Sequence, residues 1–75
     1  MGLMDIKKRF GGAVKARREV LGISQEELGM RIDADQAYVS RIEAGKMNMT
    51  LETAEQVAQA LQIDVVALLQ GMRAG

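Results

Sequence analysis

The sequence contains no cysteine, histidine, proline or tryptophan, and aromatic residues make up 3% of its 75 positions. Without thiols or imidazoles the chain cannot form disulfide bonds, thiolate or imidazole metal sites, or a histidine proton relay. Its acidic residues do not follow the spacing of a calcium-binding loop. Because proline is absent and β-branched residues are sparse, the composition predicts an all-helical fold.

The chain also lacks a net charge and any long apolar run. No transmembrane helix or signal peptide is therefore predicted, and we expect a cytoplasmic protein. The charge is uneven, because residues 1–22 carry six basic and two acidic residues. That basic third is as compatible with a phosphate-binding face as with a solvated helix surface. The length and the apolar content of 48% predict one globular domain over residues 1–75.

Apolar residues recur at helical spacing from about residue 5 to residue 21, where Gly22 ends the first predicted helix. Gly11 and Gly12 interrupt this helix, which is tolerable if another helix passes close by or if the first turn is frayed. Arg17 lies on the apolar face and is expected to extend its charged end outward to solvent. The apolar stripe comprises Ile6, Phe10, Ala13, Val14 and Leu21.

Four shorter helices are expected after the first one. The residues that cap their N-termini are Ser24, Asp35, Thr50 and Asp64, and the second helix has Glu27 placed to complete a capping box. Their expected ends lie near residues 33, 44, 61 and 70. The side chains expected to face inward are Leu28, Ile32, Val39, Ile42, Leu51, Ala54, Val57, Ala58 and Leu61. Five helices joined by short loops predict a compact bundle.

Residues 24–45 meet the requirements of two short helices that cross steeply at a tight turn. Gly29 supplies a small residue where the two backbones would touch. Asp33 stands where the turn needs a positive φ, a conformation that Asp tolerates better than most residues. Ala34 fills the turn with an apolar group, and Asp35 caps the next helix. This spacing predicts a helix-turn-helix.

The run GISQEELGMRIDADQAYVSRIEAGKMNMTLETAEQVAQAL resembles the Cro/CI-type (XRE) family of helix-turn-helix DNA-binding domains, and the likeness covers about residues 10–70. The resemblance implies a lambda-repressor-like bundle of five helices that binds double-stranded DNA. It also implies a homodimer on a palindromic operator that regulates transcription as an autoregulatory repressor or controller. The stretch DQAYVSRIEAGKMNMTL is similar to controller proteins of restriction-modification systems, although Gln36 and Met47 stand where those proteins usually carry arginine.

The resemblance places the third helix in the major groove of DNA. Gln36 would read adenine and Arg41 would read guanine. The residues expected to face the base edges are Gln36, Ala37, Ser40 and Arg41; the residues expected to face phosphates are Arg18, Gln25, Tyr38, Lys46 and Asn48. Arg18 and Glu43 also match an ion pair of the family. Packing at the rim between helices remains an alternative role for Tyr38, and an ordinary polar loop remains one for residues 46–48.

The last helix, about residues 64–72, is more apolar than one buried stripe requires. Val66, Leu69 and Met72 lack a partner within the chain, which predicts a two-fold dimer; capping of the monomer core is the alternative. No cofactor, small-molecule ligand or membrane partner is expected, and no enzyme, because neither serine has a base to activate it. An antitoxin or a helical interaction module on the same fold, with a partner from a neighbouring gene, stays open as a second function.

Overall fold

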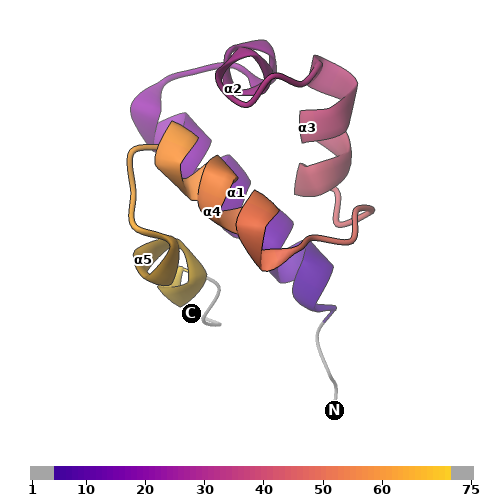
Figure 1. The fold of residues 1–75 in the computed structure, drawn as a ribbon, viewed down its shortest axis with the longest axis vertical. Coiled ribbons are helices and arrows are strands. Elements are labelled where there is room, and N and C mark those ends of the chain that lie inside the picture. The colour runs from indigo at the N-terminus through magenta and orange to yellow at the C-terminus, as the bar shows by residue number, and fades with distance from the viewer. Residues whose placement is uncertain (1–4, 72–75) are drawn as a thin grey trace.

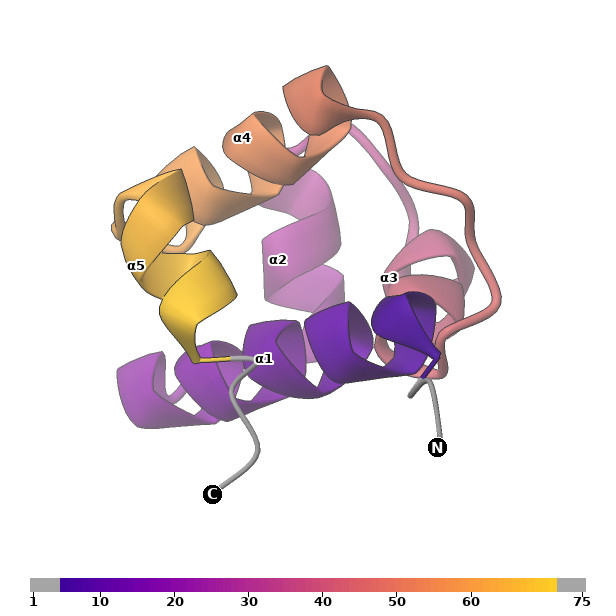
Figure 2. The same ribbon diagram turned by 90° about the horizontal axis from the view of Figure 1, so that it is seen from below.

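The computed structural model describes residues 5–71, which form five helices joined by short loops (Figure 1). They are α1 (Ile6–Leu21), α2 (Gln25–Arg31), α3 (Gln36–Glu43), α4 (Leu51–Ala60) and α5 (Val65–Gln70). Figure 2 shows α1 and α4 at two levels, with α5 between them at one end and α3 beside the start of α1 at the other. Within residues 5–71, no helix has the length and apolar character needed to span a membrane.

The predicted helix starts are confirmed by their N-caps. The Ser24 hydroxyl accepts the backbone N–H of Glu27 at 3.0 Å, and the Asp35 carboxylate accepts that of Tyr38 at 2.8 Å. Asp5, Thr50 and Asp64 cap α1, α4 and α5 in the same way. The predicted capping box differs in one respect, since the Glu27 carboxylate accepts a hydrogen bond from Arg31 one turn later, at 3.2 Å.

A single apolar cluster holds the five helices together. Its buried members are Phe10, Ala13, Val14, Leu28, Ile32, Val39, Ile42, Ala54, Val57, Ala58, Leu61 and Leu68. Two expected core residues are exposed instead: Ile6 is 60% exposed and Leu51 is 86% exposed. Each is the first residue of its helix, and both line a shallow hollow of about 190 Å³ rather than the packed centre.

The expectation that Arg17 extends to solvent is wrong. Its guanidinium donates from Nε to the carbonyl of Leu61 at 3.0 Å and from Nη2 to the carbonyl of Gln62 at 3.1 Å. These carbonyls lie at the C-terminal end of α4, where backbone oxygens lack partners within the helix and the helix dipole favours a cation. Arg17 therefore joins α1 to the end of α4.

The glycines of α1 have different surroundings. The backbone of α3 passes directly against Gly11, which confirms that a close approach by another helix explains this residue. Gly12 faces open space. Because α3 also packs against α2, its position relative to the rest of the domain is set by two neighbouring helices.

Candidate nucleic-acid interface

The turn between α2 and α3 has the geometry that the sequence predicts. Asp33 has a φ of 57°, so the one position that needs a positive φ is occupied by Asp. The N–H of Ala34 donates to the carbonyl of Gly29 at 2.8 Å. A Cβ on Gly29 would lie 2.8 Å from the Ala34 carbonyl oxygen, closer than real Cβ contacts allow. Gly29 therefore permits the tight crossing of the two helices.

Helix α3 presents one polar face to solvent. Val39 and Ile42 are buried on its inner side, where α3 packs against α1 and α2. The four predicted base-reading residues, Gln36, Ala37, Ser40 and Arg41, are all exposed. Figure 1 shows α3 at the edge of the domain, separated from α2 by the turn. The rest of the domain therefore does not cover the predicted reading face.

A buried ion pair lies behind this face. Arg18 of α1 and Glu43 of α3 approach to 2.7 Å between Nε and Oε2, with side chains only 11% and 5% exposed. The Arg18 Nη2 donates to Glu43 Oε1 at 3.0 Å, and Nη1 donates to the carbonyl of Ile23 at 3.0 Å. The hydrogen bond to Glu43 raises the pKa of the Arg18 guanidinium against the opposing effect of burial. The expected pairing of Arg18 with Glu43 is thus present.

Two glutamine side chains extend the ion pair to the start of α3. Gln25 donates from Nε2 to Glu43 Oε1 at 3.0 Å, and Gln36 donates from Nε2 to Gln25 Oε1 at 3.2 Å. Gln25 is half-buried and sits at the N-terminus of α2, where backbone N–H groups also favour an anion. Separate roles were predicted for these residues, but the structure joins them in one hydrogen-bond network.

The loop after α3 contacts both α3 itself and the first turn of α1. Arg41 Nε lies 3.5 Å from the sulfur of Met47, and Lys46 is exposed next to it. Lys7 Nζ donates to Asn48 Oδ1 at 3.4 Å, while the backbone of Gly45 lies against Lys8 of α1. Sequence reasoning did not assign Lys7 and Lys8 to this region. The signal that could have found them is the basic run at residues 7–9.

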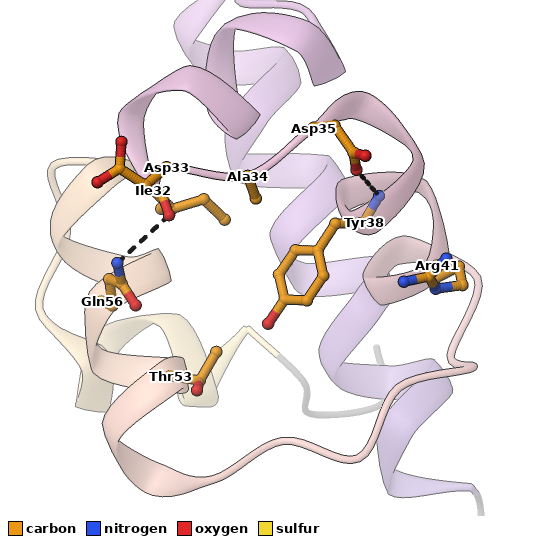
Figure 3. Close-up of a pocket in the computed structure, with 8 residues that line it drawn as sticks. All are labelled: Ile32, Asp33, Ala34, Asp35, Tyr38, Arg41, Thr53 and Gln56. Carbon is orange, nitrogen blue, oxygen red and sulfur yellow. Dashed lines mark hydrogen bonds between the residues drawn. The ribbon is translucent and has the colours of Figure 1, made fainter.

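Tyr38 points away from the outer face of α3. An open hollow of about 490 Å³ lies between the turn, α3 and α4. Figure 3 shows the Tyr38 ring directed into it with the hydroxyl toward Thr53, while Arg41 lies on the other side of the ring. Gln56 donates from Nε2 to the carbonyl of Ile32 at 3.5 Å on the far side of this hollow. The ring is half-buried against the core. This position corresponds to rim packing, and a phosphate contact by the Tyr38 hydroxyl remains a prediction.

Helix α5 leaves apolar side chains on the surface. Val66 is 58% exposed and Leu69 is 39% exposed, while Leu68 is buried in the core. The third residue predicted for this surface, Met72, lies outside the described residues. Both views place α5 at the opposite end of the domain from α3 (Figures 1 and 2).

Comparison with known proteins identifies relatives along most of the chain. The Helix-turn-helix family model matches residues 14–68. The control protein C.MunI of a Mycoplasma species is 42% identical over 65 residues, which cover 85% of this chain and 88% of that protein. The crystal structure of the restriction-modification controller protein C.AhdI from Aeromonas hydrophila superposes with a TM-score of 0.77 at 34% identity, covering 85% of this chain and 91% of that one.

A third protein shares the fold alone. The restriction-modification controller protein C.Esp1396I, whose structure is that of a tetramer with its natural 35-base-pair operator, is 24% identical with a TM-score of 0.80. The match covers 95% of this chain and 92% of that protein. The family match and the relatives both indicate a helix-turn-helix protein, and the exposed face of α3 agrees with that assignment. The chain belongs to the Cro/CI-type helix-turn-helix family and is a DNA-binding transcriptional regulator rather than an enzyme.

Proposed function

We propose that this protein is the controller of a restriction-modification system, acting in a bacterial cytoplasm as a homodimer on a palindromic operator of its own gene and a neighbouring one. The observation that carries the proposal is the uncovered polar face of α3, held in place by the buried pair of Arg18 and Glu43. Several relatives are control proteins, and their likeness to this chain is the reason for proposing that class of regulator. The basic residues near α3 supply the electrostatic attraction to phosphates that operator binding needs.

In the proposed complex, α3 lies in the major groove and reads bases with its exposed face. Gln36 pairs with adenine, Arg41 pairs with guanine, and the methyl group of Ala37 contacts thymine, with Ser40 on the same face. Arg41 is exposed, so its guanidinium can leave the weak contact with the Met47 sulfur when a base is present.

Phosphate contacts flank this reading face. Gln25 lies at the N-terminus of α2 and keeps one amide N–H beyond its bond to Glu43. Lys46 and Asn48 lie in the loop after α3, and we add Lys8, whose backbone lies against Gly45 at the start of that loop. Arg18 makes only a secondary contribution, since most of its donors are used inside the protein. Tyr38 contributes if its hydroxyl turns out of the hollow beside Thr53.

The proposed dimer forms through α5. Val66 and Leu69 are exposed there, and the hollow that adjoins Leu69 continues the apolar surface to Ile6 and Leu51. Burial against a second copy would remove this surface from water. Because α5 lies at the other end of the domain from α3, dimerisation leaves both reading helices uncovered. C.Esp1396I, which has the same fold, is a tetramer in its structure with operator DNA, which supports self-association of this chain on DNA.

Selection of binding sites from a pool of random duplexes tests the DNA-binding role. We expect enrichment of two inverted half-sites whose centres are about 10 base pairs apart, and an affinity that falls as salt rises. A protein that enriches no sequence, or whose affinity does not respond to salt, would contradict the proposal. A stable complex with the product of a neighbouring gene, formed without any duplex preference, would indicate the antitoxin or interaction-module alternative.

The oligomeric state tests the dimer surface. Val66→Glu and Leu69→Glu should convert the dimer to a monomer in sedimentation experiments, because the charge would be buried unpaired. Met30→Glu is the matched control, since Met30 is 72% exposed on α2 and lies outside the proposed interface. Equal effects of the three substitutions would rule out α5 as the dimer surface.

A further inference from the structure

The exposed face of α3 has short side chains at its centre. Ala37 and Ser40, one turn apart, are both exposed. The longer side chains on this face engage neighbouring elements. Gln36 donates from Nε2 to a side chain of α2 at 3.2 Å, and Arg41 Nε lies 3.5 Å from the sulfur of Met47 in the loop after α3. The short residues leave room for a base edge to approach the helix closely.

Ala37 differs in chemistry from the other residues of this face. Gln36, Ser40 and Arg41 all carry hydrogen-bonding groups, whereas Ala37 offers a methyl group alone. A methyl group cannot distinguish donors from acceptors on a base, and it gains affinity only by contact with another apolar group. Among the four ordinary bases, the C5-methyl of thymine is the apolar group that the major groove presents.

Cytosine that is methylated at C5 presents the same apolar group. In 5-methylcytosine the methyl group lies at the same edge of the pyrimidine as in thymine, and the pairing with guanine is unchanged. The two bases differ at C4, where thymine has an oxygen acceptor and cytosine has an NH₂ donor. Ala37 has no group that reads this difference.

We propose that Ala37 makes this protein responsive to cytosine methylation, because it binds the C5-methyl of 5-methylcytosine as it binds that of thymine. The inference rests on the proposed DNA-binding function, with α3 in the major groove. It extends the ligand of the reading face from the four ordinary bases to C5-methylated cytosine. Methylation of the operator would then strengthen binding without any change in the protein.

The size of the effect follows from the apolar surface that one methyl group removes from water. Burial of a single methyl group strengthens binding by about threefold. A dimer makes the contact once in each half-site, so an operator that is methylated in both half-sites should bind about tenfold more tightly.

The experiment starts from the operator selected by the unaltered protein from random duplexes. Each pyrimidine position of its half-site, on either strand, carries in turn thymine, uracil, cytosine or 5-methylcytosine, with the matching purine opposite. Fluorescence anisotropy gives the dissociation constant of each duplex. Thymine against uracil, and 5-methylcytosine against cytosine, each measure the contribution of the C5-methyl group alone.

The variants remove the methyl group of the protein. Ala37→Gly deletes it, and Ala37→Ser replaces one of its hydrogens with a hydroxyl group that loses water on contact with a methyl group. Ala16→Gly is the matched control, since Ala16 is an exposed helical residue of α1 and loses the same atom outside the reading face. Circular dichroism melting establishes that each variant is folded, and the serine variant serves if the glycine variant is not.

We expect one position in the half-site at which thymine binds about threefold more tightly than uracil, and 5-methylcytosine about threefold more tightly than cytosine. Ala16→Gly should keep both differences. Ala37→Gly should lose both, and Ala37→Ser should reduce both. The contributions of C5-methyl groups at other positions should not change with residue 37.

Three results would overturn the inference while leaving the DNA-binding role intact. The C5-methyl group changes affinity at no position, thymine responds where 5-methylcytosine does not, or both differences survive in the folded variants of Ala37. Absence of any selected sequence with the unaltered protein would instead overturn the proposed function itself. The two failures are therefore distinguishable.

Discussion

Gly11 of α1 lies directly against the backbone carbonyl of Ile42 in α3. A Cβ at residue 11 would overlap that oxygen and would lie 2.6 Å from the carbonyl oxygen of Glu43. The same contact holds α3 at the distance at which Arg18 reaches Glu43. The closeness of α1 and α3 is therefore part of the geometry that places the reading face.

The adjacent glycines provide a matched test of this contact. Gly11→Ala should lower the free energy of unfolding by about 1–3 kcal/mol, because the obstructing atoms belong to the backbone and cannot move aside alone. Gly12→Ala should raise it by up to about 1 kcal/mol, since the position is exposed and helical. Urea denaturation measures both changes. Equal effects of the two substitutions would show that the contact does not constrain the fold.

Arg17→Leu tests the link between α1 and the end of α4. The substitution restores an aliphatic side chain on the apolar face but removes the donors to the carbonyls of Leu61 and Gln62. We expect a loss of about 1–2 kcal/mol in the free energy of unfolding, because these hydrogen bonds involve a charged donor. Lys15→Leu, at an exposed position on the same helix, should change it by less than about 0.5 kcal/mol. A stabilising Arg17→Leu would contradict this role.

Asp33→Gly tests the strain of the turn. Asp33 holds a φ of 57°, a conformation that costs a non-glycine residue about 1–2 kcal/mol, partly offset by the greater unfolded-state entropy of glycine. The variant should therefore raise the midpoint of thermal unfolding, whereas Asp33→Ala should not. Both should bind the selected operator as the unaltered protein does. A lower midpoint for Asp33→Gly would mean that the Asp33 side chain stabilises the turn.

Arg41→Ala and Lys46→Ala separate base reading from phosphate binding. Arg41→Ala should lower the preference for the selected operator over random duplexes by about tenfold or more, with a smaller effect on random duplexes. Lys46→Ala should weaken binding to both and should reduce the slope of affinity against salt by about 1. Fluorescence anisotropy titrations at several salt concentrations measure these quantities. Identical behaviour of the two variants across sequences would show that the assigned roles are wrong.

The sequence by itself determined the helices and the turn. Ser24, Asp35 and Thr50 were predicted as N-caps and occupy those positions, because a cap bonds a backbone N–H two or three residues away. The positive φ at Asp33 was likewise predictable, since it depends on the local path of the chain through the turn. Both N-caps and turn conformations depend only on residues within about one helical turn along the chain.

Tertiary structure alone decided where the long polar side chains and the marginal apolar ones go. Arg17 finds its partner in Leu61, 44 residues later, and Gln25 finds one in Glu43, 18 residues later. Periodicity assigned Ile6 and Leu51 to the core, yet both are exposed at the first turns of their helices. The physical reason is that periodicity defines which face of a helix is apolar. Which neighbour covers that face, and how far along it, depends on how distant helices pack.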